Sequence, residues 1–241
     1  MTREFTKLKK KVLRFLANNR RPIVQTPEPI LGSFAPHSLY DRIGERADFF
    51  IHAGYRVRND NQLFDDTDNS DDWQAEVYEF AREIAERDGL GKILDIGCGS
   101  GYKLLKYLGD KDTYGAELPR AYEYLKRKYP DRQWRLSDFQ SIEIDVDLVI
   151  ASDVIEHLPN PDELLTYIQR LQPKQIVLST PDRNLLLCGR HDGPPINPAH
   201  VREWSYFEFR RYIEEFFEIE EHFISFPAQA TQCLLCKPKS A

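Results

Sequence analysis

Three glycines at alternate positions follow a short apolar run that ends in an acid, in the segment KILDIGCGSGY at residues 92–102. The apolar run predicts a buried strand, and the residues after it have the spacing of a helix. A turn from a strand into a helix lies at the carboxyl edge of a parallel sheet, where open α/β folds bind their ligands. Because small residues let a ligand touch the main chain, the segment predicts a binding loop.

The order of residues in this loop indicates which class of ligand it binds. A P-loop needs a lysine followed by serine or threonine, whereas here Lys103 comes after the serine and the glycines. Dinucleotide sites seat a pyrophosphate with the spacing G-x-G-x-x-G, but these glycines are spaced G-x-G-x-G behind Asp95. The loop therefore favours an adenosine compound without phosphate over NAD.

The stretch D-x-G-x-G-x-G at Asp95 to Gly101 resembles motif I of the class I S-adenosylmethionine-dependent methyltransferases. A second stretch, SDVIEHLPNPDELL at residues 152–165, resembles the fourth motif of small-molecule enzymes of this class. The resemblance covers about residues 73–237. It implies an α/β fold with a doubly wound, Rossmann-like, seven-stranded sheet that is mostly parallel, has an antiparallel last strand, and carries helices on both faces.

The resemblance also implies which residues hold the cofactor, S-adenosylmethionine. Glu117 ends the second expected strand, where the family has an acid that binds both ribose hydroxyls. Asp138 ends the third strand in the place of an acid that reads the adenine amino group, and Phe139 has the place of an apolar residue that packs on the ring. The expected cofactor contacts are Asp95, Gly97, Cys98, Gly99, Gly101, Glu117, Leu118, Asp138, Phe139, Ser152 and Asp153.

The elements that position these residues follow from an alternation of short apolar runs with helical patterns, which predicts a parallel sheet with crossover helices. A capping box, SYFE at 205–208, predicts the start of the last helix, and Asp72 is expected to cap a helix whose apolar stripe includes Trp73. The strands are expected over 92–96, 113–118, 133–138, 147–152 and 175–180, and the final two, over 218–225 and 231–237, as an antiparallel pair.

Residues 1–72 are expected to form an N-terminal basic helix and a lead or lid segment, and residues 73–241 the cofactor-binding domain. Apolar residues at helical spacing over 3–18, with lysines between them, predict a basic amphipathic helix. Such a helix packs on its own domain or in a homodimer, and the alternative is peripheral contact with an anionic membrane surface.

Methyl transfer to a hydroxyl requires that the hydroxyl lose its proton, and a general base typically contributes about 10²- to 10⁴-fold to such a step. His157 lies one turn beyond the fourth expected strand and is the first choice for this base. Asp153 is expected to assist it or to contact the cofactor. The alternative is that His157 only caps the turn or lines the pocket.

The segment 180–204 is long, polar and rich in turns, which is typical of a loop that recognises a substrate. His191, Asp192 and His200 could bind a divalent ion, but histidines in loops more often form hydrogen bonds, so we assign no metal. An anionic acceptor could bind the arginines at 183, 190 and 202, and a sugar face could stack on Trp204. The alternative for these residues is hydrogen bonding that stabilises the loop.

Composition limits the partners and the compartment. The net charge of −6 provides no attraction for phosphates, so no nucleic-acid partner is expected. The acidic stretch 60–72 lacks the glycine and the glutamate of a calcium loop. Four irregularly spaced cysteines predict reduced thiols, with Cys233 and Cys236 on opposite faces of a strand. With no apolar run of 18 residues to span a membrane, we expect a cytoplasmic protein.

The sequence thus predicts a transferase that uses S-adenosylmethionine to methylate an oxygen of a sugar, a glycan or another small hydroxylated acceptor. Methylation of nitrogen or carbon in a small molecule is an alternative, since a nitrogen acceptor needs no base. A non-catalytic partner protein that binds the cofactor is another. The glycine spacing opposes an NAD-dependent oxidoreductase.

Overall fold

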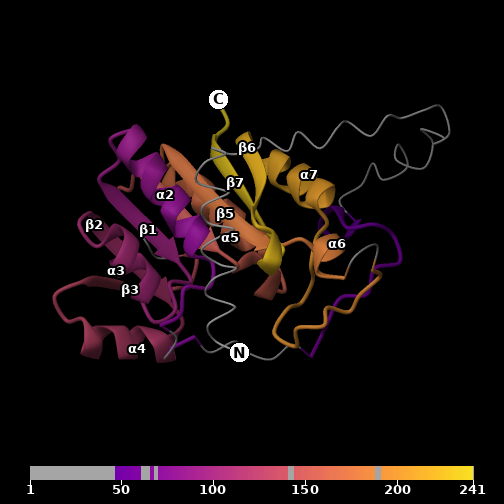
Figure 1. Ribbon diagram of the computed structural model, residues 1–241, viewed down its shortest axis with the longest axis horizontal. Coiled ribbons are helices and arrows are strands. Elements are labelled where there is room, and N and C mark those ends of the chain that lie inside the picture. Colours follow the sequence, from indigo (N-terminus) through magenta and orange to yellow (C-terminus); the bar gives the residue numbers. More distant parts are fainter. Residues whose placement is uncertain (1–46, 61–65, 68–69, 141–143, 188–190, 241) are drawn as a thin grey trace, which may run out of the picture. The chain divides into compact units, whose positions relative to one another are not determined.

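The computed structural model describes residues 47–60, 66–67, 70–140, 144–187 and 191–240, which belong to one compact unit (Figure 1). The predicted amphipathic helix over 3–18 lies outside the described residues, as does Arg190. The proposed roles of that helix in dimerisation or membrane contact, and the domain boundary at residue 72, therefore stay predictions.

The seven strands form one sheet in the order β3-β2-β1-β4-β5-β7-β6. The first five pair in parallel, while β7 runs antiparallel to both β5 and β6. This arrangement confirms the predicted doubly wound fold with its antiparallel last strand. The strands are β1 (Lys92–Ile96), β2 (Asp112–Glu117), β3 (Gln133–Leu136), β4 (Leu148–Ser152), β5 (Gln175–Pro181), β6 (Phe217–Phe226) and β7 (Thr231–Pro238).

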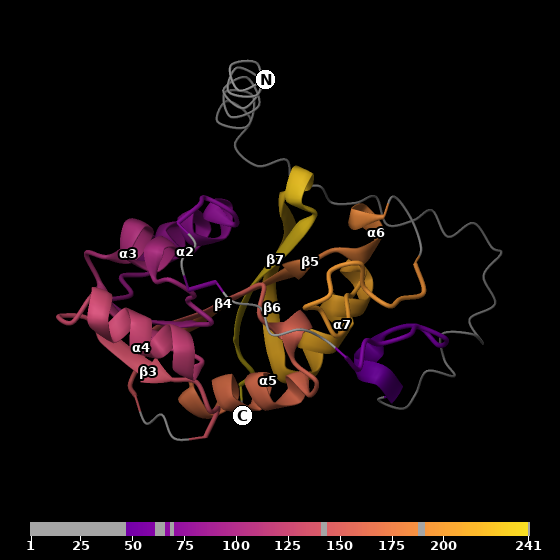
Figure 2. The same ribbon diagram turned by 90° about the horizontal axis from the view of Figure 1, so that it is seen from below.

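Helices cover both faces of the sheet (Figures 1 and 2). Side chains of α2, α3 and α4 pack into one apolar cluster, and those of α5 and α7 into another. Cys233 belongs to the first cluster and Cys236 to the second, which confirms that the two thiols lie on opposite faces of β7. The helices are α2 (Ala75–Arg87), α3 (Tyr102–Leu108), α4 (Pro119–Lys128), α5 (Pro161–Leu171), α6 (Arg183–Leu186) and α7 (Tyr206–Phe216).

One helix start was predicted correctly and another was not. The capping box before α7 is present, with the Ser205 amide donating to Glu208 Oε2 at 2.8 Å. The prediction that Asp72 caps α2 is wrong, because Gln74, two residues later, has the N-cap position and the Asp72 carboxylate pairs with Lys106 of α3. Trp73 does not join the apolar stripe of α2, since 52% of its surface is exposed.

Residues 47–60 pack along the segment that precedes α7. The Trp204 indole N–H donates to the Phe49 carbonyl at 2.8 Å, and the amides of Arg56 and Arg58 donate to carbonyls at Asp192 and Val201, each at 2.8 Å. Trp204 has no exposed surface, so the idea that it stacks on a sugar is wrong. These contacts fix the long segment 191–204 against the body of the fold.

Asp147 joins the amino ends of three strands. Its Oδ2 accepts hydrogen bonds from the amides of Gly91 and Lys92 at 2.9 and 3.0 Å, and its Oδ1 lies 2.8 Å from Lys174 Nζ, just before β5. The bond from Lys174 and the two amides hold the pKa of this carboxyl down, at about 2. Because the folded-state pKa lies below the unfolded value, the stabilisation is full above about pH 4 and is lost as the pH falls through about 2.

We predict that Asp147→Asn lowers the free energy of unfolding at pH 6 by on the order of 1–2 kcal/mol. The difference from the wild type should shrink at pH 3, where the wild-type carboxylate begins to take up its proton. Urea unfolding at both pH values measures it, with Asp145→Asn as the control, because Asp145 is 89% exposed and pairs only at the surface with Lys92. A difference that does not change with pH would contradict this account.

Candidate functional site

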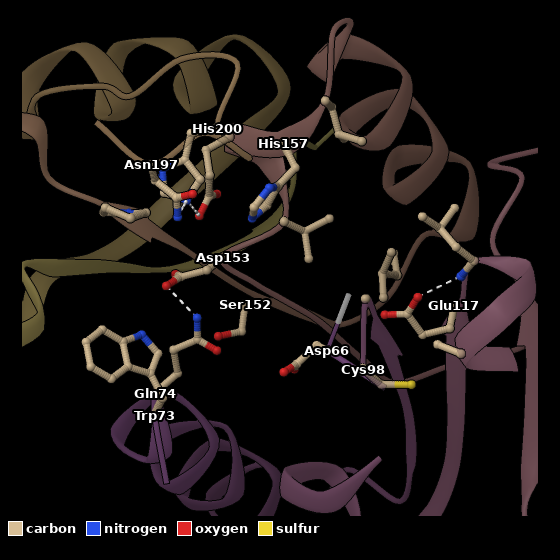
Figure 3. Close-up of a pocket in the computed structure, with 18 of the residues that line it drawn as sticks. Asp66, Trp73, Gln74, Cys98, Glu117, Ser152, Asp153, His157, Asn197 and His200 are labelled. Atoms are coloured by element: carbon tan, nitrogen blue, oxygen red, sulfur yellow. Dashed lines mark hydrogen bonds and ion pairs between the residues drawn. The ribbon is translucent and has the colours of Figure 1, made fainter. Parts of the chain in front are cut away.

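A cavity of about 960 Å³ opens at the carboxyl ends of the parallel strands. The last residues of β1, β2, β4 and β5 all line it. Figure 3 shows Cys98 and Glu117 on one side of this cavity and Asp153, His157 and His200 on the other. The cavity therefore lies where the sequence predicts a binding loop.

The glycine loop needs its glycines because of its main-chain conformation. Gly97, Gly99 and Gly101 have φ angles of +74°, +56° and +72°, in the left-handed region that other residues rarely adopt. A Cβ atom on Gly97 would also lie 2.5 Å from a methyl carbon of Val154. The alternating glycines thus shape a loop that brings Gly97 and Cys98 to the cavity wall.

Glu117 holds this loop in place. Its Oε1 accepts the Gly99 amide hydrogen at 2.9 Å, and its Oε2 accepts that of Leu118 at 2.6 Å, just before α4 begins. The carboxylate therefore links the loop after β1 to the end of β2 while it remains at the cavity wall.

Asp95 lies behind the loop. It is fully buried, its Oδ2 accepts a hydrogen bond from the Tyr78 hydroxyl at 2.9 Å, and its Oδ1 has no hydrogen-bond partner among the described residues. Burial raises the pKa of this carboxyl to about 7.

The structure brings most of the expected cofactor residues to the cavity wall. Four of them are not part of the cavity lining, namely Asp95, Gly99, Gly101 and Asp138. Gly99 lies against Asp66, and Gly101 lies at the start of α3. The Asp138 carboxylate accepts the Gln140 amide hydrogen at 2.9 Å. The expected residues that do line it are Gly97, Cys98, Glu117, Leu118, Phe139, Ser152 and Asp153.

Asp153 occupies the wall opposite the glycine loop. Its φ angle is +51°, and its Oδ1 accepts a hydrogen bond from the Ser179 hydroxyl at 2.6 Å. Its Oδ2 accepts one from the Gln74 side chain at 2.5 Å (Figure 3). The carboxylate is therefore fixed between β5 and the start of α2.

His157 lies beside Asp153 at the end of a 3₁₀ turn, Ile155–His157. Its Nδ1 donates to the Ala199 carbonyl at 3.0 Å, so the lone pair of the neutral ring is on Nε2. Burial, together with the nearby His200, lowers the pKa of His157 to about 4. The ring is therefore neutral at physiological pH.

His200 and Glu156 complete this end of the cavity. The His200 ring lies edge-on to that of His157 at 4.8 Å, and its Nδ1 lies 2.6 Å from Glu203 Oε1. Glu156 has no exposed surface, and its Oε2 accepts a hydrogen bond from the Thr180 hydroxyl at 3.0 Å. Burial and the neighbouring Asp153 carboxylate raise the pKa of Glu156 well above its usual value.

The cation ligands considered from sequence do not meet. The His191 ring accepts the Gly193 amide hydrogen at 3.0 Å, and Asp192 pairs with His52 at 2.8 Å. His200 instead lies with Glu156 and His157. Sequence spacing alone could not reveal this grouping, because His200 reaches the other two across more than forty residues.

Two of the arginines considered for an anionic acceptor are used by the protein itself. Arg183 is buried, bonds the Glu203 carbonyl at 2.8 Å and pairs with Glu208 at 2.7 Å. Arg202 donates to the carbonyls of Leu158 and Pro159 at 2.7 and 2.8 Å. The structure supports the alternative for both, that they stabilise the loop.

Sequence reasoning missed the contribution of the residues before α2. Asp66, Thr67, Trp73 and Gln74 all line the cavity. No motif or periodic pattern marks this stretch, so its place could only follow from the fold.

Among the residues that the structure describes, none belongs to a helix long and apolar enough to cross a membrane.

A family model described as a methyltransferase domain matches residues 2–230. A probable S-adenosylmethionine-dependent methyltransferase of Mycolicibacterium smegmatis is 31% identical over 155 residues, which are 60% of this chain and 58% of that protein. The match thus spans little more than half of the relative's length.

Solved structures show the same fold at low identity. Magnesium protoporphyrin IX methyltransferase of Synechocystis PCC 6803, with bound SAH, aligns with a TM-score of 0.54 at 15% identity, over 69% of this chain and 84% of that one. The PH0226 protein of Pyrococcus horikoshii OT3 aligns with a TM-score of 0.53 at 18% identity, over 72% and 94% of the two chains.

The raised pKa of Asp95 predicts that the stability of the fold depends on pH. Between about pH 4 and pH 7 the folded carboxyl keeps a proton that the unfolded chain has released, so the free energy of unfolding falls as the pH rises. Asp95→Asn cannot ionise and keeps an acceptor for Tyr78. The free energy of unfolding of this variant, relative to that of the wild type, should therefore rise by roughly 2–4 kcal/mol between pH 4 and pH 8. Urea unfolding at both pH values measures this, and parallel profiles for the two proteins would contradict it.

Proposed function

Because the chain belongs to the methyltransferase domain family, we propose that it transfers a methyl group from S-adenosylmethionine to a hydroxyl oxygen of a small acceptor, such as a sugar or glycan unit. The observation that carries this proposal is the left-handed glycine loop, with the Glu117 carboxylate bound to its Gly99 amide at 2.9 Å. Bare main chain and a strand-end carboxylate suit an adenosyl compound without phosphates.

The cavity walls divide into two regions with different chemistry. On the cofactor side, Glu117 is placed to accept hydrogen bonds from ribose hydroxyls, and Phe139 and Leu118 offer apolar surface to an adenine ring. The volume of about 960 Å³ is at the upper end for ligand cavities, which leaves room for an acceptor beside the cofactor.

The acceptor side combines polar and apolar side chains. His157, Asp153 and Glu156 line it, and so do Trp73 and Ile196, which are 52% and 70% exposed. Exposed apolar side chains around a polar site favour an acceptor with an apolar face as well as a hydroxyl. Trp73, rather than the buried Trp204, is the tryptophan able to stack on such an acceptor.

When bound, S-adenosylmethionine supplies a methyl group on a sulfonium, which keeps the electron pair of the broken bond. The protein aligns the acceptor oxygen with that bond and excludes water from the site. The His157 ring is neutral and its Nδ1 donates to the Ala199 carbonyl, so the lone pair that would take the hydroxyl proton is on Nε2. Such a base matters for an oxygen acceptor, which is why we favour oxygen over nitrogen.

The described cysteines are consistent with work in a reducing compartment such as the cytoplasm. Cys98, Cys233 and Cys236 are all free and buried. Buried thiols of this kind pack as small apolar groups.

Gly97→Ala should weaken S-adenosylmethionine binding at least tenfold, because the added methyl group displaces the loop at the cavity wall. Gly89→Ala is the matched control, since Gly89 has a similar φ of +66° but no atom within 4 Å of the added carbon. Calorimetric titration with S-adenosylmethionine, S-adenosylhomocysteine and NAD measures the affinities. Equal affinities for the two variants, or tighter binding of NAD, would count against the assignment.

His157→Ala should lower turnover by about 10²-fold or more while it leaves the affinity for S-adenosylmethionine nearly unchanged. The reason is that His157 lies on the acceptor side of the cavity. Transfer of a labelled methyl group to a panel of hydroxylated compounds, read by mass, provides the measurement. Gly89→Ala should keep the wild-type rate. If His157→Ala also keeps it, His157 has no part in the chemistry.

A further inference from the structure

Three potential metal ligands converge at the acceptor end of the cavity. A carboxylate oxygen of Glu156 and one ring nitrogen each of His157 and His200 lie within 4.8 Å of one another. Glu156 and His157 come from the turn after β4. His200 comes from the segment before α7 and lies beside His157 (Figure 3). The fold therefore brings together one oxygen and two nitrogens on a wall of the cavity.

Both imidazole rings are held in the manner that metal ligands require. His157 Nδ1 lies 3.0 Å from the Ala199 carbonyl oxygen, and His200 Nδ1 lies 2.6 Å from Glu203 Oε1. Histidines that bind metals almost always donate their other N–H to a carbonyl or a carboxylate, which fixes the ring and leaves the lone pair on the second nitrogen. Each ring thus has Nε2 as its potential ligand atom.

The Asn197 side chain contacts Nε2 of His200. Its Nδ2 lies 2.9 Å from His200 Nε2, an arrangement in which the amide donates to the ring lone pair. In this arrangement Nε2 is the acceptor nitrogen of the ring and Nδ1 carries the N–H. A cation at the site would replace the amide, so Asn197 has to turn aside toward the cavity that it lines.

Glu156 is buried without a compensating positive charge. Its Oε1 has no hydrogen-bond partner among the described residues and lies 4.0 Å from His200 Nε2. Asp153 and Glu203 add further negative charge beside it. To ionise a buried carboxyl group without a partner is costly, and a bound cation is one of the few groups that can offset that cost.

We propose that Glu156, His157 and His200 bind one divalent transition-metal cation. Two imidazoles with one carboxylate suit ions such as Mn²⁺, Fe²⁺ or Zn²⁺, whereas Mg²⁺ and Ca²⁺ prefer oxygen ligands. Three protein ligands leave coordination positions open to the cavity.

The role of this cation rests on the proposed function. An acceptor hydroxyl bound to the cation has a lowered pKa, so it can lose its proton to water and present its oxygen to the methyl group. The lone pair of His157 then binds the cation instead of a proton. On this account, the loss of turnover in His157→Ala comes from the loss of the cation.

Titration of the chelator-treated full-length protein with MnCl₂ tests the site without cofactor or acceptor. Electron paramagnetic resonance of the free Mn²⁺ ion should show one Mn²⁺ bound per chain. Glu156→Gln and His200→Ala should weaken binding at least tenfold, and Glu203→Gln about 10- to 100-fold through the ring that it orients. His191→Ala is the control, because its ring lies with Gly193, outside the cluster.

The outcomes separate this proposal from the proposed function. Binding of S-adenosylmethionine by the same variants shows that they are folded. The proposal is overturned if the wild type binds no stoichiometric Mn²⁺, if His200→Ala binds it as tightly as the wild type, or if His191→Ala loses as much affinity. Mn²⁺ binding in a chain that fails to bind S-adenosylmethionine would keep the metal site and remove the methyltransferase proposal. Methyl transfer that is unaffected by chelation would remove the catalytic role of the cation.

Discussion

The hydrogen bond between the Gly99 amide and the Glu117 carboxylate, 2.9 Å long, is the contact on which the site depends. It joins the loop after β1 to the end of β2, and the same carboxylate also accepts the Leu118 amide hydrogen at the start of α4. The loop can approach the carboxylate because its glycines adopt left-handed torsions that a Cβ atom would strain. One acidic side chain thus sets the shape of the cavity beside the glycine loop.

The second half of the cavity follows from the order of the strands. Since β1 lies between β2 and β4, the chain leaves the sheet in opposite directions on the two sides of β1, and a crevice opens at that point. The turn after β4 supplies Asp153, Glu156 and His157 to the crevice. Residues 47–60 hold the segment that adds His200. Two walls of different chemistry, one of main chain and one of acids and imidazoles, therefore face each other across a single space.

Local patterns predicted the strands, the crossover helices and the glycine loop, because these depend on residues close together in sequence. Features set by distant contacts were missed or misassigned. Asp72 is a residue type that often caps helices, but its carboxylate pairs with Lys106 of α3. Tryptophan often stacks on sugar rings, but the Trp204 indole is buried and donates to the Phe49 carbonyl. His200 was grouped with its neighbours in sequence, although the fold places it beside His157.

A crystal structure of the protein with S-adenosylhomocysteine bound tests the central claim most directly. The account predicts that the ligand lies along the main chain of Gly97 to Gly101, with both ribose hydroxyls within hydrogen-bonding distance of the Glu117 carboxylate. A ligand found elsewhere on the protein, or a ribose that makes no contact with Glu117, would contradict it.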